Sequence, residues 1–460
     1  MAEQEPRGID SETSVDVVIV GAGPAGLAAA TALVDAGRTV AVLEARDRVG
    51  GRTWTDTVDG AMLELGGQWV SPHQTTLLET IERLGLETFP RYRVGESVYV
   101  HPDGSAERFT GDFPIDAATL AEVDRLVAVI EGLVAEIDPE APWDHPRARE
   151  LDTVAFERWL RDQTDDRAAA SLTALFIGPA MLTKPSHAFS TLQALLMAAS
   201  AGGFANLLDE DEILDRRVVG GMQQVSVRMA EALGDAVHLS APVRRIERSD
   251  DGVRVVADGV VVRGRRVIVA VPPNLITRID VQPPLPRRQH QLHQHLSLGI
   301  VIKVHAVYDR PFWREAGLSG TGFGPDELVH ELYDNTNHAD ARGTLVGFVS
   351  DEHADAAFLL SDEERRRRIL DSIAHYLGPE ALEPVVYYES DWGSEEWTRG
   401  AYAASYDLGG LHRYGPDQRQ PVGPIHWACS DYAGHGYQHV DGAIRSGRQA
   451  AEDVLATLGA

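Results

Sequence analysis

The 460-residue sequence has one cysteine, two lysines and no long apolar run. The single thiol, Cys429, rules out an intrachain disulfide and a cysteine-based metal site. No run approaches the length of about 18 apolar residues that indicates a membrane-spanning helix. Residues 1–14 form a polar, acidic tail without the apolar centre of a signal peptide. These absences favour a soluble cytoplasmic protein.

Positive charge is also scarce. The chain has 42 lysines and arginines against 70 acidic residues, which gives a net charge of −28. Such a chain is not expected to bind nucleic acid or an anionic membrane. The two lysines, Lys184 and Lys303, stand out in a chain that otherwise uses arginine. A retained lysine indicates a place where the bulk and fixed charge of arginine do not serve, although chance retention also explains either one alone.

Three histidines, His290, His293 and His295, first suggest a metal site. On a helix the first two share a face but His295 does not, and no carboxylate lies nearby in the sequence. A polar surface helix without a metal is the expected structure.

Residues 15–55 carry the most informative pattern of the chain. The apolar run at 17–20 predicts a strand, a helical pattern covers 28–36, and 39–43 predicts a second strand. This order is typical of the βαβ unit that binds dinucleotides.

Glycines at the strand–helix turn have the spacing that such a unit requires. Gly21 permits the tight turn, Gly23 lets the backbone approach a pyrophosphate, and Gly26 lets helix and strand pack closely. Glu44 stands 23 residues after the first glycine, near the distance of about 20 expected for the acid that binds the adenosine ribose. An acid there disfavours the 2′-phosphate of NADP.

A second glycine-rich segment follows and distinguishes FAD from NAD. Arg46, Arg48 and the run at 50–53 resemble the second fingerprint of flavoproteins with two dinucleotide-binding motifs. We therefore expect an FAD protein.

The rest of the chain predicts a mixed α/β fold with a mainly helical stretch at 111–213, in which Trp159, Leu160, Leu175 and Phe176 are expected in the core. Further strands are expected at 236–240, 243–247, 253–257, 266–271, 299–308, 343–349 and 385–389, and further helices at 362–377 and 440–458. We expect a Rossmann-like FAD domain assembled from 15–85, 215–290 and 396–460. A substrate domain with a mixed sheet flanked by helices is expected from 86–214 and 291–395.

Long segments of the chain resemble flavin-dependent amine oxidases in the same order: EARDRVGGRTWTDT, GGQWVSP, GMQQVS, SLGIVIKVHAVYD, YDNTNH, SDWGSEEWTRGAY and GYQHVDGA. The resemblance implies oxidation of an amine to an imine by flavin, with hydride moving to flavin N5 and O2 becoming H2O2. The imine is then hydrolysed to an aldehyde and ammonia. Pairing into a homodimer is also implied.

The resemblance assigns three catalytic positions. Lys303 lies in the alternating strand pattern at 299–304 and matches a lysine that holds water near flavin N5. Tyr402 and His439 match the two walls of a cage beside the flavin, and we expect His439 to be neutral because a cation would repel an amine. Trp392 matches a tryptophan near the flavin ring, whereas Trp397 is expected in the core.

Cofactor contacts are expected from both fingerprints and from the resemblance. FAD is expected to be bound non-covalently, because Ala401 stands where some family members carry the linking cysteine. Asp431 replaces a more usual glutamate. The full set is Gly21, Gly23, Gly26, Glu44, Arg46, Gly51, Arg52, Gly67, Gln68, Trp69, Val243, Trp392, Asp431 and Val440.

Glu331 predicts the substrate, because broad-range monoamine oxidases have a neutral gating residue at this position. An acid in an apolar channel is costly unless it meets a cation, and the distal ammonium of a diamine supplies one. The expected substrates are putrescine and similar aliphatic diamines, with O2 as the second substrate. An exposed acid in a loop is the alternative interpretation of Glu331.

Two other functions remain open. An oxidase for amino acids or monoamines has the same fold, and the former needs a cation for the substrate carboxylate, for which Arg91 and Arg93 are candidates. A flavoprotein that only serves as an interaction module has no need of Lys303, Tyr402 and Glu331 together.

Overall fold

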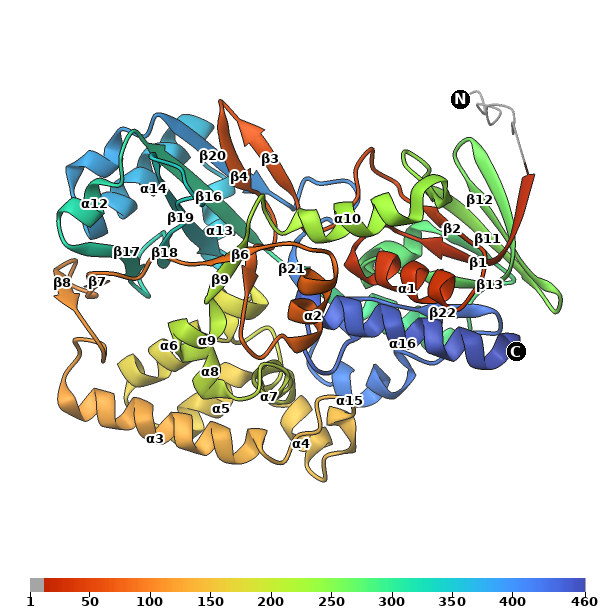
Figure 1. The fold of residues 1–460 in the computed structure, drawn as a ribbon. Helices are drawn as coiled ribbons and strands as arrows, with labels where there is room; N and C mark the ends of the chain where they lie inside the picture. The colour runs from red at the N-terminus through yellow and green to blue at the C-terminus, as the bar shows by residue number, and fades with distance from the viewer. Residues whose placement is uncertain (1–11, 460) are drawn as a thin grey trace.

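The computed structural model describes residues 12–459, and two large β-sheets organise them (Figure 1). In order across the first sheet, the strands are β10 (Val237–His238), β2 (Val40–Leu43), β1 (Glu12–Val20), β13 (Val260–Val269), β12 (Gly252–Ala257), β11 (Val243–Ser249) and β14 (Asp280–Gln282), with β22 (Ile425–Trp427) paired to β13. The central strand β1 is parallel to both β2 and β13. This is the sheet that the glycine fingerprint predicts.

Strand β1 begins earlier than the sequence pattern suggests. Residues 12–14, placed in the polar tail by their composition, pair with residues 261–263 of β13. Their backbone hydrogen bonds to a neighbouring strand hold a polar segment that has no apolar side chains to bury. Residues 1–11 of the predicted tail lie outside the described residues.

Helices cover the first sheet, and two of them come from opposite ends of the chain (Figure 1). Helix α1 (Pro24–Asp35) follows β1, and its neighbour α16 (Val440–Leu458) is the last helix. Buried side chains of both helices pack with Val17 and Ile19 in one apolar cluster. Helix α10 (Gln223–Leu233) also packs against α1.

The second large sheet is mixed and lies at the other end of the molecule (Figure 1). Its order is β20 (Val386–Asp391), β16 (Val301–Tyr308), β19 (Gly343–Ser350), β18 (Glu331–Asp334), β17 (Leu318–Phe323), β7 (Glu96–Val100) and β8 (Ala106–Phe109). Helices α12 (Phe312–Glu315), α13 (Asp351–Phe358) and α14 (Asp362–Leu377) accompany it.

Successive side chains of β16 point to opposite faces of this sheet, and the two faces have different neighbours. Ile302, Val304 and Ala306 share an apolar cluster with Ile369 and Ile373 of α14. Successive side chains of a strand point to opposite faces, so Lys303 lies on the other face, away from α14.

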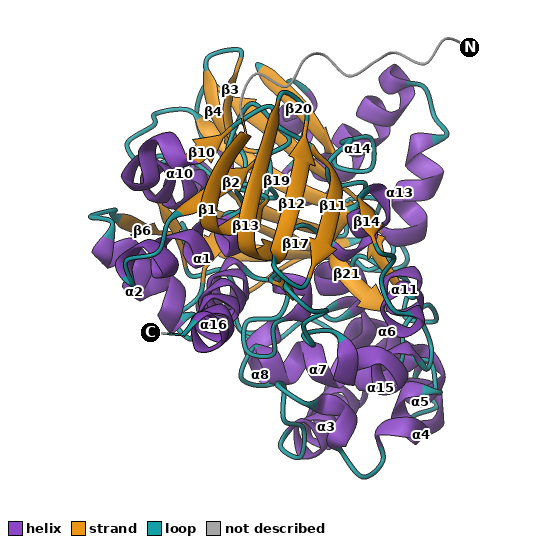
Figure 2. Ribbon diagram, turned by 90° about the vertical axis from the view of Figure 1, so that its right-hand side faces the viewer, coloured by secondary structure: helices purple, strands orange, loops and turns teal. Residues whose placement is uncertain are grey.

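A group of helices lies below both sheets (Figures 1 and 2). It contains α3 (Ala117–Val134), α4 (Ala148–Asp152), α5 (Phe156–Gln163), α6 (Arg167–Leu175), α7 (Thr191–Ser200), α8 (Phe204–Leu208), α9 (Glu210–Ile213) and α15 (Gly410–Tyr414). Helix α7 has every residue buried. Among residues 12–459, no helix is both long and apolar enough to cross a membrane.

Short strands and two further helices connect these parts. They are the hairpin β3 (Thr55–Val58) and β4 (Ala61–Glu64), the pair β15 (Leu296–Gly299) and β21 (Ala401–Tyr406), the trio β5 (Trp69–Val70), β9 (Arg216–Val218) and β6 (Thr88–Pro90), and helices α2 (Thr75–Arg83) and α11 (Arg287–Gln294). The predicted mixed α/β class is confirmed.

Helix α11 corrects one expectation, because it is not a fully exposed polar helix. His293 is buried, and its ring lies edge-on to that of Trp427 with centroids 5.5 Å apart. Burial lowers the pKa of His293 to about 4. No group of three metal-ligating side chains is found among the residues that the structure describes.

Candidate active site

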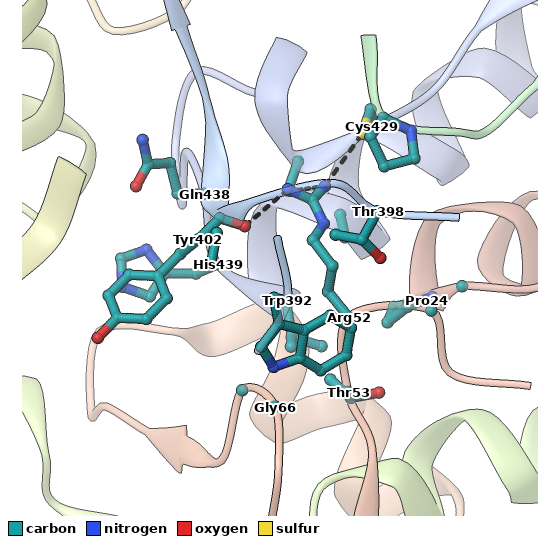
Figure 3. A pocket seen from close by; sticks show the side chains of 18 of the residues that line it. Pro24, Arg52, Thr53, Gly66, Trp392, Thr398, Tyr402, Cys429, Gln438 and His439 are labelled. Carbon is teal, nitrogen blue, oxygen red and sulfur yellow. Dashed lines mark hydrogen bonds between the residues drawn. The ribbon is translucent and has the colours of Figure 1, made fainter. Parts of the chain in front are cut away.

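A cavity is lined by residues from the first turn of α1 and from strands β18 and β19 of the second sheet. Figure 3 shows the part of it around Arg52. The first two fingerprint glycines, Gly21 and Gly23, lie at one end of the series of lining residues, and Glu331 and Phe348 lie on the sheet at the other. The same cavity is thus lined by residues that are more than 400 positions apart in the chain, such as Gly21 and His439.

The turn before α1 has the shape of a phosphate cradle. Gly21 has a φ of +103°, which favours glycine. A Cβ on Gly26 would lie 2.0 Å from the carbonyl oxygen of Gly21, so this position also requires glycine. A Cβ on Gly23 would meet only the Cα of Gly51, 3.9 Å away. The two glycine-rich loops therefore approach each other closely at the N-terminus of α1, where backbone N–H groups favour an anion.

Glu44 ends β2 and is held firmly by backbone donors. Its Oε2 accepts from the backbone N–H of Ala22 at 2.7 Å, and its Oε1 accepts from that of Arg46 at 2.9 Å. The buried carboxylate lines the cavity beside the phosphate cradle. Its remaining lone pairs suit a ribose hydroxyl, which fits the dinucleotide expectation.

Arg52 joins three separate segments around the cavity (Figure 3). Its Nη1 donates to the carbonyl oxygen of Tyr402 at 2.9 Å, and its Nη2 donates to the hydroxyl of Ser430 at 3.0 Å and to the Sγ of Cys429 at 3.3 Å. It also forms an ion pair with the buried carboxylate of Asp431. Because Arg52 belongs to the second glycine-rich loop, this loop is tied to both β21 and the segment before α16.

Three rings line the cavity beside this junction. Tyr402 stands on β21, His439 directly precedes α16, and the indole of Trp392 donates to the carbonyl oxygen of Leu65 at 2.9 Å. Figure 3 shows the rings of Tyr402 and His439 projecting to the same side, away from Arg52. His439 Nδ1 lies 2.9 Å from the carbonyl oxygen of Tyr437 and must be its donor, and burial lowers the pKa of this imidazole. The hydrogen bond to Tyr437 acts to raise this pKa, but burial is the larger effect and favours the neutral imidazole with its proton on Nδ1.

Lys303 is buried on the cavity side of β16 and lines the cavity. Its Nζ donates to the carbonyl oxygens of Glu64 at 2.6 Å and Gly66 at 2.8 Å, and to Gln68 Oε1 at 2.5 Å. Burial lowers its pKa to about 7, although the nearby Glu64 acts in the opposite direction. The structure thus places the sequence-predicted lysine in the cavity wall, close to the segment of residues 64–68.

Glu331 is 5% exposed and lines the same cavity from β18. Burial raises its pKa to about 8, while a hydrogen bond from Tyr333 acts to lower it. The carboxyl group is therefore not in an exposed loop, as the alternative interpretation held. It is a buried acid for which a cationic ligand supplies the missing charge partner.

Aromatic rings surround Glu331 on its own and the adjoining strands. Phe348 lies opposite Glu331 on β19, and its ring is edge-on to Tyr402 with centroids 6.2 Å apart. Trp69 lies 5.7 Å from the Tyr333 ring and 5.9 Å from the Phe348 ring. A path of aromatic side chains therefore connects the Tyr402 cage to Glu331.

Most of the predicted site residues line the cavity, but two of the predicted cofactor contacts do not. Gly26 acts through its close packing against Gly21. Asp431 contacts Arg52 and accepts from the backbone N–H of Ala404, so it supports the wall from behind.

Arg91 and Arg93, the candidate cations for an amino-acid carboxylate, also lie outside the cavity wall. Arg91 Nη1 donates to Thr321 Oγ1 at 3.1 Å, and Arg93 pairs with Asp211 and Asp215. Both arginines also donate to the carbonyl oxygen of Leu214. They fasten the segment after α9, and this placement does not support the amino-acid oxidase alternative.

Two residues that the sequence assigned to the core also line the cavity. Phe176 is buried in the main apolar cluster, as expected, and contributes to the wall as well, whereas Trp397 is only partly buried and has the guanidinium of Arg278 4.4 Å from its ring. Both side chains are apolar, so periodicity alone cannot distinguish packing against the core from facing a cavity. Three residues behind the wall, Glu64, Arg217 and Asn335, were not predicted. The signal for Asn335 was its place in the YDNTNH segment, and that for Glu64 was its place two residues before the GGQWVSP segment, whereas Arg217 lies in no segment of the resemblance.

Comparison with known proteins agrees with this geometry. The family of flavin-containing amine oxidoreductases matches residues 24–455. A putrescine oxidase from Kocuria rosea is 65% identical to this chain over 99% of it and 98% of the relative. A solved structure of a putrescine oxidase bound to putrescine has a TM-score of 0.96 and 66% identity, and covers 97% of this chain and 100% of its own. Cyclohexylamine oxidase from Brevibacterium oxydans has a TM-score of 0.90 and 31% identity, with 96% of this chain and 99% of its own covered.

Proposed function

The chain belongs to the family of flavin-containing amine oxidoreductases, and we propose that it oxidises one primary amine of putrescine and of similar aliphatic diamines. It is an FAD-dependent enzyme. When bound, FAD would supply the redox chemistry, in which two electrons leave the amine and reach O2. One diamine, one O2 and one water yield an aminoaldehyde, ammonia and H2O2.

The cofactor is held by the residues that form the cradle and its neighbours. The N-terminus of α1 with Gly21, Gly23 and Gly51 suits the diphosphate, and Glu44 suits the adenosine ribose. Arg52 fixes the loop, β21 and the segment before α16 in their mutual positions. Together these residues shape the site before the substrate arrives.

The reacting amine is positioned by Tyr402, His439 and Lys303. Tyr402 and His439 hold it between their rings, and a neutral His439 leaves the neutral amine unrepelled. Such positioning contributes a large part of the rate. Lys303, close to its point of half-protonation at neutral pH, supplies a proton donor to the oxygen-reacting step.

Glu331 is the residue that most strongly supports a diamine as the substrate. It is a buried acid at the end of an aromatic path that begins at Tyr402, and the distal ammonium of a diamine fills the place of its missing cation. The rings of Trp69 and Phe348 add favourable cation–π surroundings for that ammonium. A monoamine of similar length leaves the acid without a partner.

Replacing Glu331 with Gln tests this role, because the amide keeps the shape and removes the charge. A hydrogen bond to a charged group contributes about 1.5–3 kcal/mol, so kcat/KM for putrescine is expected to fall about 10- to 150-fold. Butylamine, which has no second charge, is expected to lose little or to improve. Steady-state kinetics on both amines give the ratio of the two specificities.

Glu327→Gln is the matched control. Glu327 lies four residues earlier and bonds to Ser372 and His375 rather than facing the cavity. It is expected to leave the ratio of specificities at the wild-type value. An equal fall for both amines in Glu331→Gln means that this acid serves the scaffold, and the diamine proposal then loses its main support.

We propose that FAD is bound without a covalent link. Ala401 offers no nucleophile, and the Cys429 thiol, although it lines the cavity, is engaged by Asp431 and Arg52. Burial raises the pKa of this thiol, which keeps it protonated and a weak nucleophile. Acid precipitation of the holoenzyme is therefore expected to leave all flavin absorbance in the supernatant, and yellow precipitate contradicts the proposal.

Location and assembly complete the proposal. We place the enzyme in the cytoplasm as a homodimer with no nucleic-acid or membrane partner, and we keep 15–85, 215–290 and 396–460 as the FAD domain. The net charge of −28 disfavours nucleic-acid and anionic-membrane partners, and the family resemblance implies the homodimer and the division into domains. Light scattering that gives the mass of a single chain contradicts the homodimer.

A further inference from the structure

All three protons of the Lys303 ammonium are engaged by protein oxygens. Two acceptors are the backbone carbonyls of Glu64 and Gly66, and the third is the side chain of Gln68. The Gly66 backbone is held in place, because its N–H donates to the carbonyl oxygen of Trp54 at 3.3 Å and the next N–H donates to that of Arg52 at 3.1 Å. Gln68 is thus the one acceptor of the three that can turn away from Lys303 without a movement of the main chain.

A second hydrogen bond sets which end of the Gln68 amide faces the lysine. Gln68 Nε2 donates to Asn335 Oδ1 at 2.8 Å, so Oε1 must point to Lys303. Asn335 is itself held, because its carbonyl oxygen accepts from Arg217 Nη1 at 2.7 Å and its N–H donates to Thr344. Arg217 in turn forms a buried ion pair with Glu64. The amide of Gln68 is therefore oriented by a buried polar network.

We propose that Gln68 is a positioning residue for the oxygen-reacting step: its amide oxygen, oriented by Asn335, holds the third proton of Lys303 and controls the donation of that proton into the cavity. This inference rests on the proposed function, because it gives Lys303 its role in that step. The family resemblance assigns Gln68 only to the cofactor contacts, so its role toward Lys303 is additional.

The surroundings of Lys303 make this control effective. The charged and titratable groups that face it are Glu64 on β4, Arg217 on β9 and His305 on its own strand. Glu64 and Arg217 neutralise each other as an ion pair, and burial together with Lys303 and Arg217 lowers the pKa of His305. Burial favours the neutral amine, and with the fixed charges balanced, the hydrogen bonds to the ammonium are what stabilises its charged form.

The two-lysine composition allows a direct measurement. Holoenzyme labelled with [ε-13C]lysine gives signals from Lys184 and Lys303 alone, and the Lys303→Met variant identifies which is which. Titration of the Lys303 signal then reports its pKa without any turnover. Gln68→Met removes the acceptor and is expected to lower this pKa by about one to two pH units, because the charged form loses a hydrogen bond. Gln68→Glu is expected to raise it.

Two further variants complete the design. Asn335→Leu releases the amide of Gln68 and is expected to lower the pKa of Lys303 by less than Gln68→Met does. Gln74→Met is the matched control, since Gln74 lines the same cavity and accepts from the backbone of Ser71, with no contact to Lys303. It is expected to leave the titration unchanged.

Reoxidation kinetics provide the functional readout. The rate at which O2 reoxidises substrate-reduced enzyme is expected to follow the Lys303 titration, with the midpoint lowered in Gln68→Met and raised in Gln68→Glu. An unchanged Lys303 titration in both variants overturns the proposal, and so does a shifted titration without a shifted reoxidation profile. If Gln68→Met does not fold, the isosteric Gln68→Glu decides. The Lys303 titration can be measured even if the enzyme shows no preference for diamines. The proposal on Gln68 and the proposal on diamine specificity can therefore be refuted independently.

Discussion

At the scale of residues, burial in one cavity shifts an acid, Glu331, and a base, Lys303, toward their neutral forms. It raises the pKa of Glu331 to about 8 and lowers the pKa of Lys303 to about 7. Near neutral pH an empty cavity therefore contains a largely protonated acid and a half-protonated amine. A diamine that brings its own ammonium ionises the acid, and a monoamine does not.

The ionisation of Glu331 predicts a pH dependence of specificity. Because its pKa is raised, the acid is neutral below about pH 8 and becomes charged above it. Only the charged form pairs with the distal ammonium, since alkylammonium groups keep their charge to about pH 10. The ratio of kcat/KM for putrescine to that for butylamine is expected to rise through pH 8 and then level.

Both substrates must lose a proton from the reacting amine. The pH dependence of that step therefore cancels in the ratio of the two kcat/KM values. The Glu331→Gln enzyme is the control, and its ratio is expected to be independent of pH. A flat ratio in the wild-type enzyme contradicts the assigned ionisation.

The sequence predicted chemistry at single residues better than it predicted their neighbours. Lys303, Glu331 and Tyr402 were identified by motif, and all three line the cavity. The acceptors of Lys303 were not predicted, because they lie about 240 positions earlier in the chain and depend on how β4 and β16 meet. Trp397 was misassigned to the core because a wall residue is as apolar as a core residue, whereas Phe176 is part of the core and also lines the cavity.

At the scale of elements, glycine allows α16 to lie against α1. A Cβ on Gly447 of α16 would lie 2.1 Å from the carbonyl oxygen of Ala25 in the first turn of α1. Gly447→Ala therefore forces the two helices apart. Overpacking of this kind costs about 1–3 kcal/mol, so the variant is expected to unfold at lower denaturant concentration and to release FAD more readily.

Gly132→Ala is the matched control for that substitution. Gly132 lies exposed inside α3 with no atom near the position of its Cβ. The change is expected to stabilise the protein by about 0.5–1 kcal/mol, because alanine is the better helix former. Equal denaturation midpoints for the two variants contradict the packing argument.

Elements with strong periodicity were predicted well and short strands were not. The segment β1–α1–β2 and helix α16 lie where the sequence pattern placed them, within a few residues. Strands β17 and β18 were not predicted, since one is rich in glycine and serine and the other has four residues. Their stability comes from neighbours in the sheet, which the local sequence does not contain.

At the scale of the whole molecule, the FAD cavity requires both ends of the chain. Its wall includes Gly21 from the turn before α1 and Pro24 from the first turn of that helix, together with His439 directly before α16 and Val440 and Ala443 within it. A chain that ends at Gln438 lacks the helix that packs on α1 and also lacks His439, the proposed second wall of the amine cage. Purified in the presence of FAD, it is expected to have no flavin absorbance, whereas the full chain prepared in parallel is yellow. Retention of flavin by the truncated chain contradicts this account.

The joining of the two ends by α1 and α16 also fixes when the holoenzyme can form during synthesis. At about 5–20 residues per second, the ribosome needs roughly 20 to 80 seconds to proceed from the first glycine fingerprint to the last helix. For that interval the apolar face of α1 and the cavity walls lack their cover. Flavin insertion therefore has to wait until α16 has been made, and the supply of free FAD at that time decides how much of the newly made protein becomes enzyme.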